Sequence, residues 1–161
     1  MATTSYNSKI IVKEHTSSQS DYSGSYKLLL APDNIPAPSS PSNTVEITNL
    51  LNDTQTFLRG IKTSDAKEVN GNLEKEYLKA LAGMEDKHLD IMHLYGSDGV
   101  GGVSKWVYES DGVSCTVSEV GGNDEAVKMS ATLTPMTVSK EVVDDYEVVD
   151  NGDGTYTVTK K

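Results

Sequence analysis

Apolar and polar residues alternate with a period of two along most of this chain, which is the pattern of half-buried β-strands. The segments predicted as strands are Tyr26–Ala31, Thr44–Thr48, Gln55–Gly60, Leu89–Tyr95, Lys105–Glu109, Val113–Glu119 and Ala126–Thr134. Asp111 and Gly112 have the chemistry of a tight turn between two of these strands. Residues 61–71 are polar and are expected to form a hairpin or loop. The alternation predicts a mainly β protein with an antiparallel meander, which Pro135 ends.

One stretch departs from this alternation and has the 3.6-residue period of an amphipathic helix. The residues that share its apolar face are Leu73, Tyr77, Ala80, Leu81 and Met84. Asn72 has a side chain suited to capping the start of the helix, and Gly83 can take the left-handed conformation that ends one. Leu78 lies off this face, where either Met84 folding back or another chain would cover it. We therefore expect one helix, about Leu73–Met84, packed across a β-sheet.

The composition divides the chain into three parts. Residues 1–25 are rich in Ser and Thr around one apolar island, Ile10–Val12, so we expect an N-terminal arm that a neighbouring chain orders. Residues 26–135 form the predicted β-domain, in which Pro32–Pro41 is a stiff, extended connector. Residues 136–161 are acidic and contain a further hairpin signal, so we expect a C-terminal arm or a surface decoration.

The charge balance narrows the range of functions. The chain carries a formal net charge of −10 and a single arginine, Arg59. Binding to a nucleic-acid backbone needs Lys and Arg to displace counterions, so this charge argues against that class of function. One cysteine, Cys115, excludes an internal disulfide. The sequence has neither the pattern of a secretion signal nor an apolar run of membrane-spanning length.

The residues that build most catalytic and metal sites do not gather in a recognisable motif. His88 and His93 are five residues apart on one strand and so point to opposite faces, while His15 stands alone in the arm. Cys115 alternates with apolar neighbours and is expected in the core. Asp150–Gly154 matches a calcium loop in part, but its acidic residues miss the required spacing, so a hairpin turn is favoured. We predict no enzyme activity, no cofactor and no metal site.

The order of motifs along the chain carries further information. After the connector come Val45–Leu50 and Phe57–Ile61, then a loop, the helix, the strand Asp90–Tyr95, a glycine-rich turn, a meander and the closing segment Val127–Pro135. This order resembles that of the major tail tube proteins of long-tailed (siphovirus-type) bacteriophages. The resemblance covers roughly Ile35 to Pro135, and its most specific parts are Val45–Thr48, Gly60-Ile61 and Ala131–Pro135.

The resemblance implies a β-sandwich or barrel-like fold with one flanking helix and extended terminal arms. It implies that six copies form a ring, that rings stack into a hollow tail tube, and that arms and loops lock one ring to the next. The genome would pass through this channel on ejection without specific binding. The implied partners are other copies of the chain, the tape measure protein, and the tail terminator and distal tail proteins. The implied location is the virion tail, after synthesis in the bacterial cytoplasm and without a membrane.

The alternative function is a secreted or surface Ig-like β-sandwich binding module. Asn151–Thr159 is the kind of hairpin that such modules carry. The predicted helix and the missing secretion signal argue against this function. Size under native conditions distinguishes the two, because a binding module stays monomeric and a tube protein forms rings.

Three predicted strands carry a face of small polar side chains, which is too polar for a core. The residues expected to line the channel on this basis are Thr44, Glu46, Thr48, Ser114, Thr116, Ser118, Lys128, Ser130 and Thr132. DNA carries one charge about every 1.7 Å of axis, so a wall of short side chains with a negative potential lets it slide. Glu46 supplies the acidic group of this wall, and Lys128 the basic one. The alternative is an ordinary solvated sheet face.

Overall fold

The structure is a computed structural model that describes residues 7–15, 21–30, 32–38, 44–47, 51, 54–55, 57–59, 65–117 and 127–161. Within these residues the chain is mainly β with a single short helix, which confirms the predicted fold class. The strands are β1 (Lys9–Glu14), β2 (Gly24–Leu28), β3 (Thr44–Glu46), β4 (Phe57–Arg59), β5 (Lys67–Asn72), β6 (His88–Tyr95), β7 (Ser104–Val117), β8 (Lys128–Pro135), β9 (Lys140–Glu141), β10 (Tyr146–Asp150) and β11 (Thr155–Lys160), and the helix is α1 (Lys75–Ala82).

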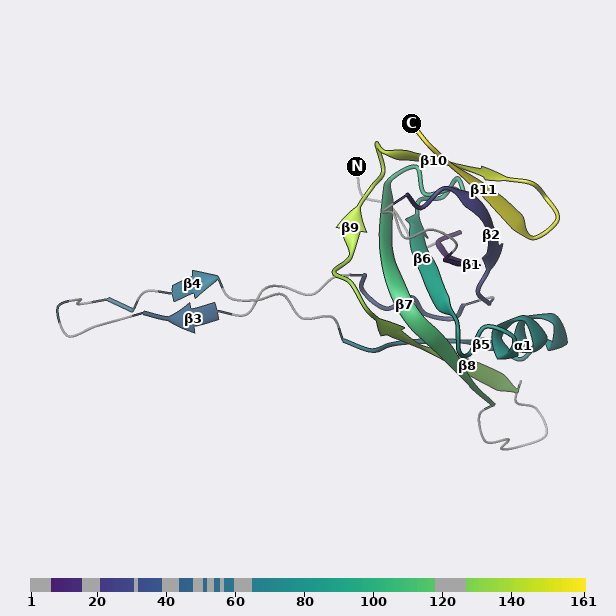
Figure 1. Cartoon of the computed structure of the whole chain (residues 1–161), viewed down its shortest axis with the longest axis horizontal. Helices are drawn as coiled ribbons and strands as arrows, with labels where there is room; N and C mark the ends of the chain where they lie inside the picture. Colours follow the sequence, from purple (N-terminus) through teal and green to yellow (C-terminus); the bar gives the residue numbers. More distant parts are fainter. Residues whose placement is uncertain are drawn as a thin grey trace.

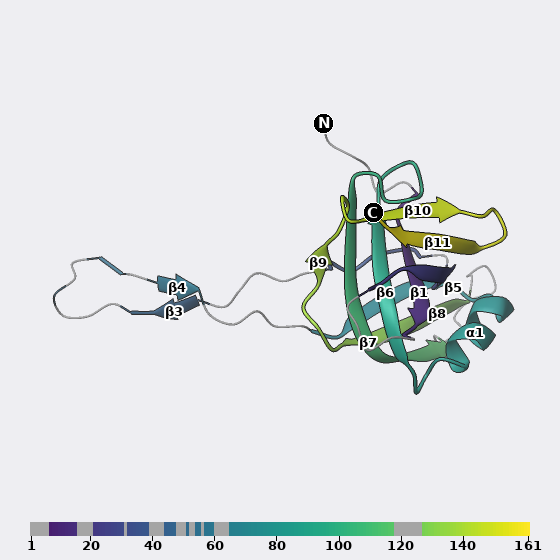
Figure 2. The ribbon, with the colours of Figure 1, turned by 45° about the horizontal axis from the view of Figure 1, so that its top comes forward.

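Nine of these strands form one antiparallel sheet in the order β10-β11-β2-β1-β6-β7-β8-β5, with β9 paired to β7. The sheet curls strongly, so that the β10–β11 hairpin and the β5–β8 pair lie at opposite ends of a curved layer (Figures 1 and 2). Its end strands, β10 and β5, do not pair with each other in the described part of the chain. The sheet is therefore sandwich-like and is not closed into a barrel.

Two hydrophobic cores lie on the two faces of this curved sheet. The first core includes Ile10, Val12, Leu89, Ile91, Tyr108, Met129, Ala131 and Leu133. The second core includes Ile11, Met92, Leu94, Val107, Tyr146, Val148, Tyr156 and Val158. Alternate residues of β1 and β6 face different cores, so both strands are buried on both faces. This burial explains why β1 reads as a continuous apolar island and not as an alternating strand.

Helix α1 is shorter than predicted, its expected N-cap is wrong, and its expected C-cap residue, Gly83, ends the helix in another conformation than predicted. Asn72 is the last residue of β5, where it pairs with Lys128 of β8 and accepts a hydrogen bond from Lys128 Nζ (2.7 Å) at Oδ1. This pairing holds Asn72 in the sheet, and Glu74 takes the N-cap position without a side-chain hydrogen bond. Gly83 has a right-handed backbone conformation (φ −71°, ψ −14°) and not the left-handed one.

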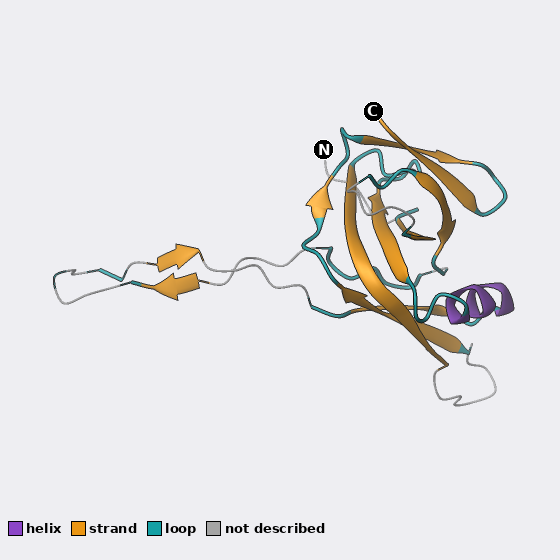
Figure 3. Ribbon diagram, in the orientation of Figure 1, coloured by secondary structure: helices purple, strands orange, loops and turns teal. Residues whose placement is uncertain are grey.

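The apolar face of α1 packs on the first core, at one end of the sheet (Figure 3). Leu81 is 1% exposed there. Leu73, Tyr77, Leu78 and Met84 are partly buried against the same core, and Ala80 is half-buried. Leu78 thus packs within its own subunit, although it lies off the predicted face.

The predicted tight turn at Asp111 and Gly112 is also wrong, because β7 runs through it as one long strand. Its pairing with β8 shifts register between Ser110 and Val113, which marks a β-bulge. Gly112 has a φ of +76°, and a Cβ at this position would collide with the carbonyl oxygen of Glu85. A two-residue hairpin turn of type I′ and a G1-type bulge both place a glycine at positive φ, so the same two residues are compatible with either structure.

Three segments outside the predicted β-domain strands belong to the sheet. β1 lies between β2 and β6, so residues 9–14 are ordered by their own subunit and the expectation of an arm ordered by a neighbour is wrong for them. β5 forms within the predicted loop 61–71. The C-terminal hairpin is confirmed as β10–β11, and it joins β2 as part of the sheet. Each of these placements depends on partners that are distant in sequence.

Candidate functional site

The hairpin of β3 and β4 projects away from the nine-stranded sheet (Figures 1 and 3). We call the described residues 44–47, 51, 54–55 and 57–59 the projecting hairpin. Its strands pair only with each other in the described part of the chain, and every residue of both is exposed. Its large apolar side chains, Val45, Ile47, Leu51, Phe57 and Leu58, are between 43% and 95% exposed. The projecting hairpin therefore presents apolar side chains without a covering layer from the described residues.

This exposure corrects the prediction that Thr44–Thr48 is a half-buried strand of the domain. Thr44 and Glu46 lie on the projecting hairpin, and Thr48 lies outside the described residues. An isolated two-stranded hairpin is marginally stable in water, and adjacent exposed apolar side chains mark interaction surfaces. The alternation in the sequence therefore indicates an amphipathic strand. Its apolar side chains, Val45 and Ile47, are not buried by the described residues of its own subunit.

The small polar residues on the other two predicted strands share one face of the sheet. Across β7, β8 and β5, Thr116 lies beside Ser130 and Ser130 beside Asn70, while Ser114, Thr132 and Glu68 form the next row. Ser130 Oγ and Asn70 Oδ1 are hydrogen-bonded at 2.5 Å. Ser118 lies outside the described residues. We call the six residues of these two rows the polar sheet face; its role as a channel lining stays a prediction.

Lys128, the basic residue predicted for the channel wall, lies next to the polar sheet face and forms an ion pair. Lys128 Nζ lies 2.9 Å from Asp33 Oδ2, in a partly exposed ion pair with the segment that follows β2. Its neighbouring side chain across the ladder, Asn72, accepts a second hydrogen bond from it. The uncharged side chains and Glu68 therefore set the character of the polar sheet face.

The opposite side of the same strands is apolar and belongs to the first core. Val69, Ala131 and Cys115 occupy the row behind Asn70, Ser130 and Thr116. Cys115 is half-buried there, and burial raises the pKa of its thiol, which keeps it protonated. The separation of polar and apolar faces matches the alternation in the sequence.

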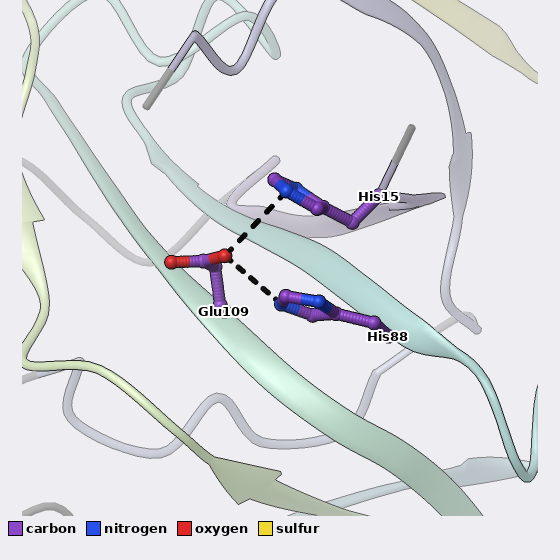
Figure 4. A group of neighbouring side chains, drawn as sticks. All are labelled: His15, His88 and Glu109. Atoms are coloured by element: carbon purple, nitrogen blue, oxygen red, sulfur yellow. Dashed lines mark ion pairs between the residues drawn. The ribbon is translucent and has the colours of Figure 1, made fainter. Parts of the chain in front are cut away.

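The expectation of isolated histidines is wrong for two of the three. β1 pairs with β6 in a register that continues to a hydrogen bond from the His15 amide to the His88 carbonyl (2.7 Å), and the two rings stack with centroids 4.3 Å apart. Glu109 of β7 faces both rings (Figure 4). Sequence reasoning missed this cluster because it placed His15 in an arm and not at the end of a central strand.

The third histidine, His93, faces the other side of β6, as predicted. Its Nε2 lies 2.8 Å from Tyr108 Oη and its Nδ1 3.2 Å from Tyr95 Oη. Burial, together with the charge of Lys67, lowers the pKa of His93 to about 3, so the ring is neutral. His93 is a core residue whose polar atoms are satisfied by tyrosines.

Comparisons with known proteins give a likeness in fold. No protein-family model and no curated protein sequence matches the chain. A chain in the cryo-EM structure of the anti-feeding prophage (AFP) baseplate, six-fold symmetrised, superposes with a TM-score of 0.57 at 9% identity, covering 89% of this chain and 98% of that one. A chain of the AFP tube-terminating cap gives a TM-score of 0.45 at 12% identity, covering 88% and 91%. Among the described residues no helix has the length and apolar character to cross a membrane.

Proposed function

We propose that this chain is a structural protein of a phage-like tail particle, in which copies of it form rings that stack into a tube. The observation that carries the proposal is the projecting hairpin with its exposed apolar side chains. The fold shared with a chain of the AFP baseplate and the order of motifs along the sequence support it. The finer assignment, a siphovirus-type tube of hexameric rings, rests on the motif order.

The projecting hairpin has the properties of a contact between subunits. Fully burying a Val, Leu or Phe side chain contributes roughly 1.5–3 kcal/mol. Val45, Phe57 and Leu58 leave about half of that burial unused in the single subunit. In our proposal a neighbouring subunit covers them, and the hairpin locks one ring to the next.

The polar sheet face supplies the channel lining in this proposal. Its short, uncharged side chains on β7 and β8 cannot hold the phosphates of DNA through counterion release. The net charge of −10 repels a passing polyanion. Thr44 and Glu46 are on the projecting hairpin, so they belong to the contact between rings and not to the wall that we propose.

The partners of the chain follow from this role. Its main partners would be other copies of the same chain. A tape measure protein would occupy the channel before DNA does. Tail terminator and distal tail proteins would close the two ends of the tube. The place of the protein is then the virion tail, and its work involves no catalysis.

A measurement of the protein's mass under native conditions tests the proposal. Size-exclusion chromatography with light scattering, run over a range of protein concentrations, should give ring-sized or larger particles that grow with concentration. A species of 17.4 kDa at every concentration would overturn the proposal and favour the binding-module alternative.

A further inference from the structure

We propose that His15, His88 and Glu109 form a binding site for a divalent transition cation of the Zn²⁺ class. His15 directly follows β1, His88 starts β6 and Glu109 lies in the middle of β7, and their side chains converge in Figure 4. The ligand atoms that they offer all lie within 4.8 Å of one another. Two imidazoles and one carboxylate form a donor set that Zn²⁺ uses with a fourth, open position.

The orientation of His15 is fixed by a group behind it. Asp90 is completely buried, and its Oδ1 lies 2.8 Å from His15 Nδ1. A carboxylate oxygen accepts hydrogen bonds, so Nδ1 carries the proton and Nε2 of the neutral ring keeps its lone pair. His15 Nε2 is directed toward Glu109 Oε1, 3.8 Å away. A carboxylate that holds the outer nitrogen of a histidine is the usual support of a metal-binding imidazole.

Asp90 has an ion-pair partner, although its Oδ2 has no hydrogen-bond partner among the described residues. Lys13 Nζ, one strand away on β1, lies 3.4 Å from its second oxygen, Oδ2. A buried carboxylate needs partners of this kind, because an unpaired buried charge is costly. Asp90 is therefore a positioning residue in our proposal, and it does not contact the cation.

His88 presents a buried ring nitrogen, Nε2, without a hydrogen-bond partner among the described residues. This nitrogen nevertheless lies 2.9 Å from Glu109 Oε1, which satisfies the distance of an ion pair but not the geometry of a hydrogen bond. A cation bound between the imidazole and the carboxylate would give this nitrogen a partner. This buried, unpartnered nitrogen is the second observation that points to a ligand.

The consequence is a tie between three strands of the sheet. A cation held by His15, His88 and Glu109 would join the residue that follows β1 to β6 and β7. It would bind where the chain leaves the sheet after β1. Water or a donor from another chain would supply the fourth ligand of the cation. The site does not depend on tail assembly, so it stands or falls separately from the proposed function.

Metal binding by the purified full chain tests the proposal. After removal of metals with a chelator, titration with ZnCl₂ by calorimetry should show one saturable site per chain, and the melting temperature should rise with Zn²⁺ and fall again with EDTA. His88→Gln and Glu109→Gln should each weaken binding at least tenfold. Glu14→Gln, the same chemical change on an exposed β1 residue next to the site, should leave affinity unchanged. Asp90→Asn should weaken it by about 10–100-fold.

A second measurement needs no variant. In the imidazole ¹H–¹⁵N spectrum of the wild-type protein, Zn²⁺ should shift the resonances of His15 and His88 and leave those of the buried His93 in place. Absence of saturable binding would overturn the proposal. So would binding that survives both His88→Gln and Glu109→Gln, because the cluster would then be an ion-pair network and the cation would bind elsewhere on this acidic chain.

Discussion

Val45 of β3 lies directly opposite Leu58 of β4, and their side chains are 52% and 55% exposed. This cross-strand pair joins the two strands of the projecting hairpin without help from either core. Cross-strand apolar pairs stabilise a hairpin by a fraction of a kcal/mol to about 1 kcal/mol each. A contact of that size does not hold an isolated hairpin, and in our proposal another subunit covers this pair.

Replacing this pair separates assembly from folding. Val45→Ser with Leu58→Ser should leave the free energy of unfolding of the single subunit within about 0.5 kcal/mol, because both side chains are exposed. The same double variant should shift assembly to higher protein concentration, as measured by light scattering. Val103→Ser changes a side chain that is 57% exposed outside the projecting hairpin, and it serves as the control. Normal assembly of the double variant would show that the projecting hairpin is not the contact.

The helix face gives a prediction about stability. Leu81→Ala should lower the free energy of unfolding by roughly 2–5 kcal/mol, because Leu81 is 1% exposed in the first core. Lys79→Ala, on the exposed side of the same helix, should change it by less than about 0.5 kcal/mol. Urea denaturation of both variants measures the difference. Equal stabilities would mean that the helix does not pack as described.

The buried His93 gives a prediction about pH. Its pKa is about 3 in the folded protein against an ordinary value of 6.5, so between these values the unfolded chain binds a proton that the folded chain does not. Stability therefore falls as pH drops through this window and is level above it, with a slope of up to about 1.4 kcal/mol per pH unit from this group. The groups facing the ring are Lys67, Tyr95 and Tyr108.

Urea unfolding between about pH 5 and pH 8 measures this dependence. His93→Gln keeps a hydrogen-bonding side chain and removes the titration, so its stability should vary less with pH than that of the wild type. Identical slopes for the two proteins would assign the pH dependence to other groups.

The channel assignment predicts protection of the polar sheet face. Thr116 is exposed in the single subunit. In a Cys115→Ala background, Thr116→Cys should react with a bulky maleimide polymer in unassembled subunits and resist it in assembled tubes. The unassembled form of the same variant is the control. Equal labelling of both forms would place this face outside the tube, although the tube itself would remain.

Local patterns in the sequence predicted several elements. The alternation in Leu89–Tyr95 predicts a strand, and the turn residues of Asp150–Gly154 predict a hairpin turn; β6 and the β10–β11 hairpin confirm both. The helix was identified from the spacing of its apolar residues. Each of these patterns involves residues only a few positions apart, so it can be recognised in the sequence without knowledge of the fold.

The remaining features depend on distant partners. From the sequence alone, the island Ile10–Val12 is assigned to an arm. In the structure it is a central strand, because it pairs with β2 on one side and with β6, about 80 residues later in the chain, on the other. Gly112 allows a turn or a bulge, and pairing with β8 decides between them. The meeting of His15 with His88 follows from the same β1–β6 register. Sequence alone does not specify that register because its contacts lie far apart along the chain.

Electron microscopy of the purified wild-type protein in negative stain tests the central claim most directly. Our account predicts rings with six-fold symmetry and a central opening, and stacks of such rings that form tubes at higher protein concentration. Particles the size of a single subunit at every concentration would contradict it.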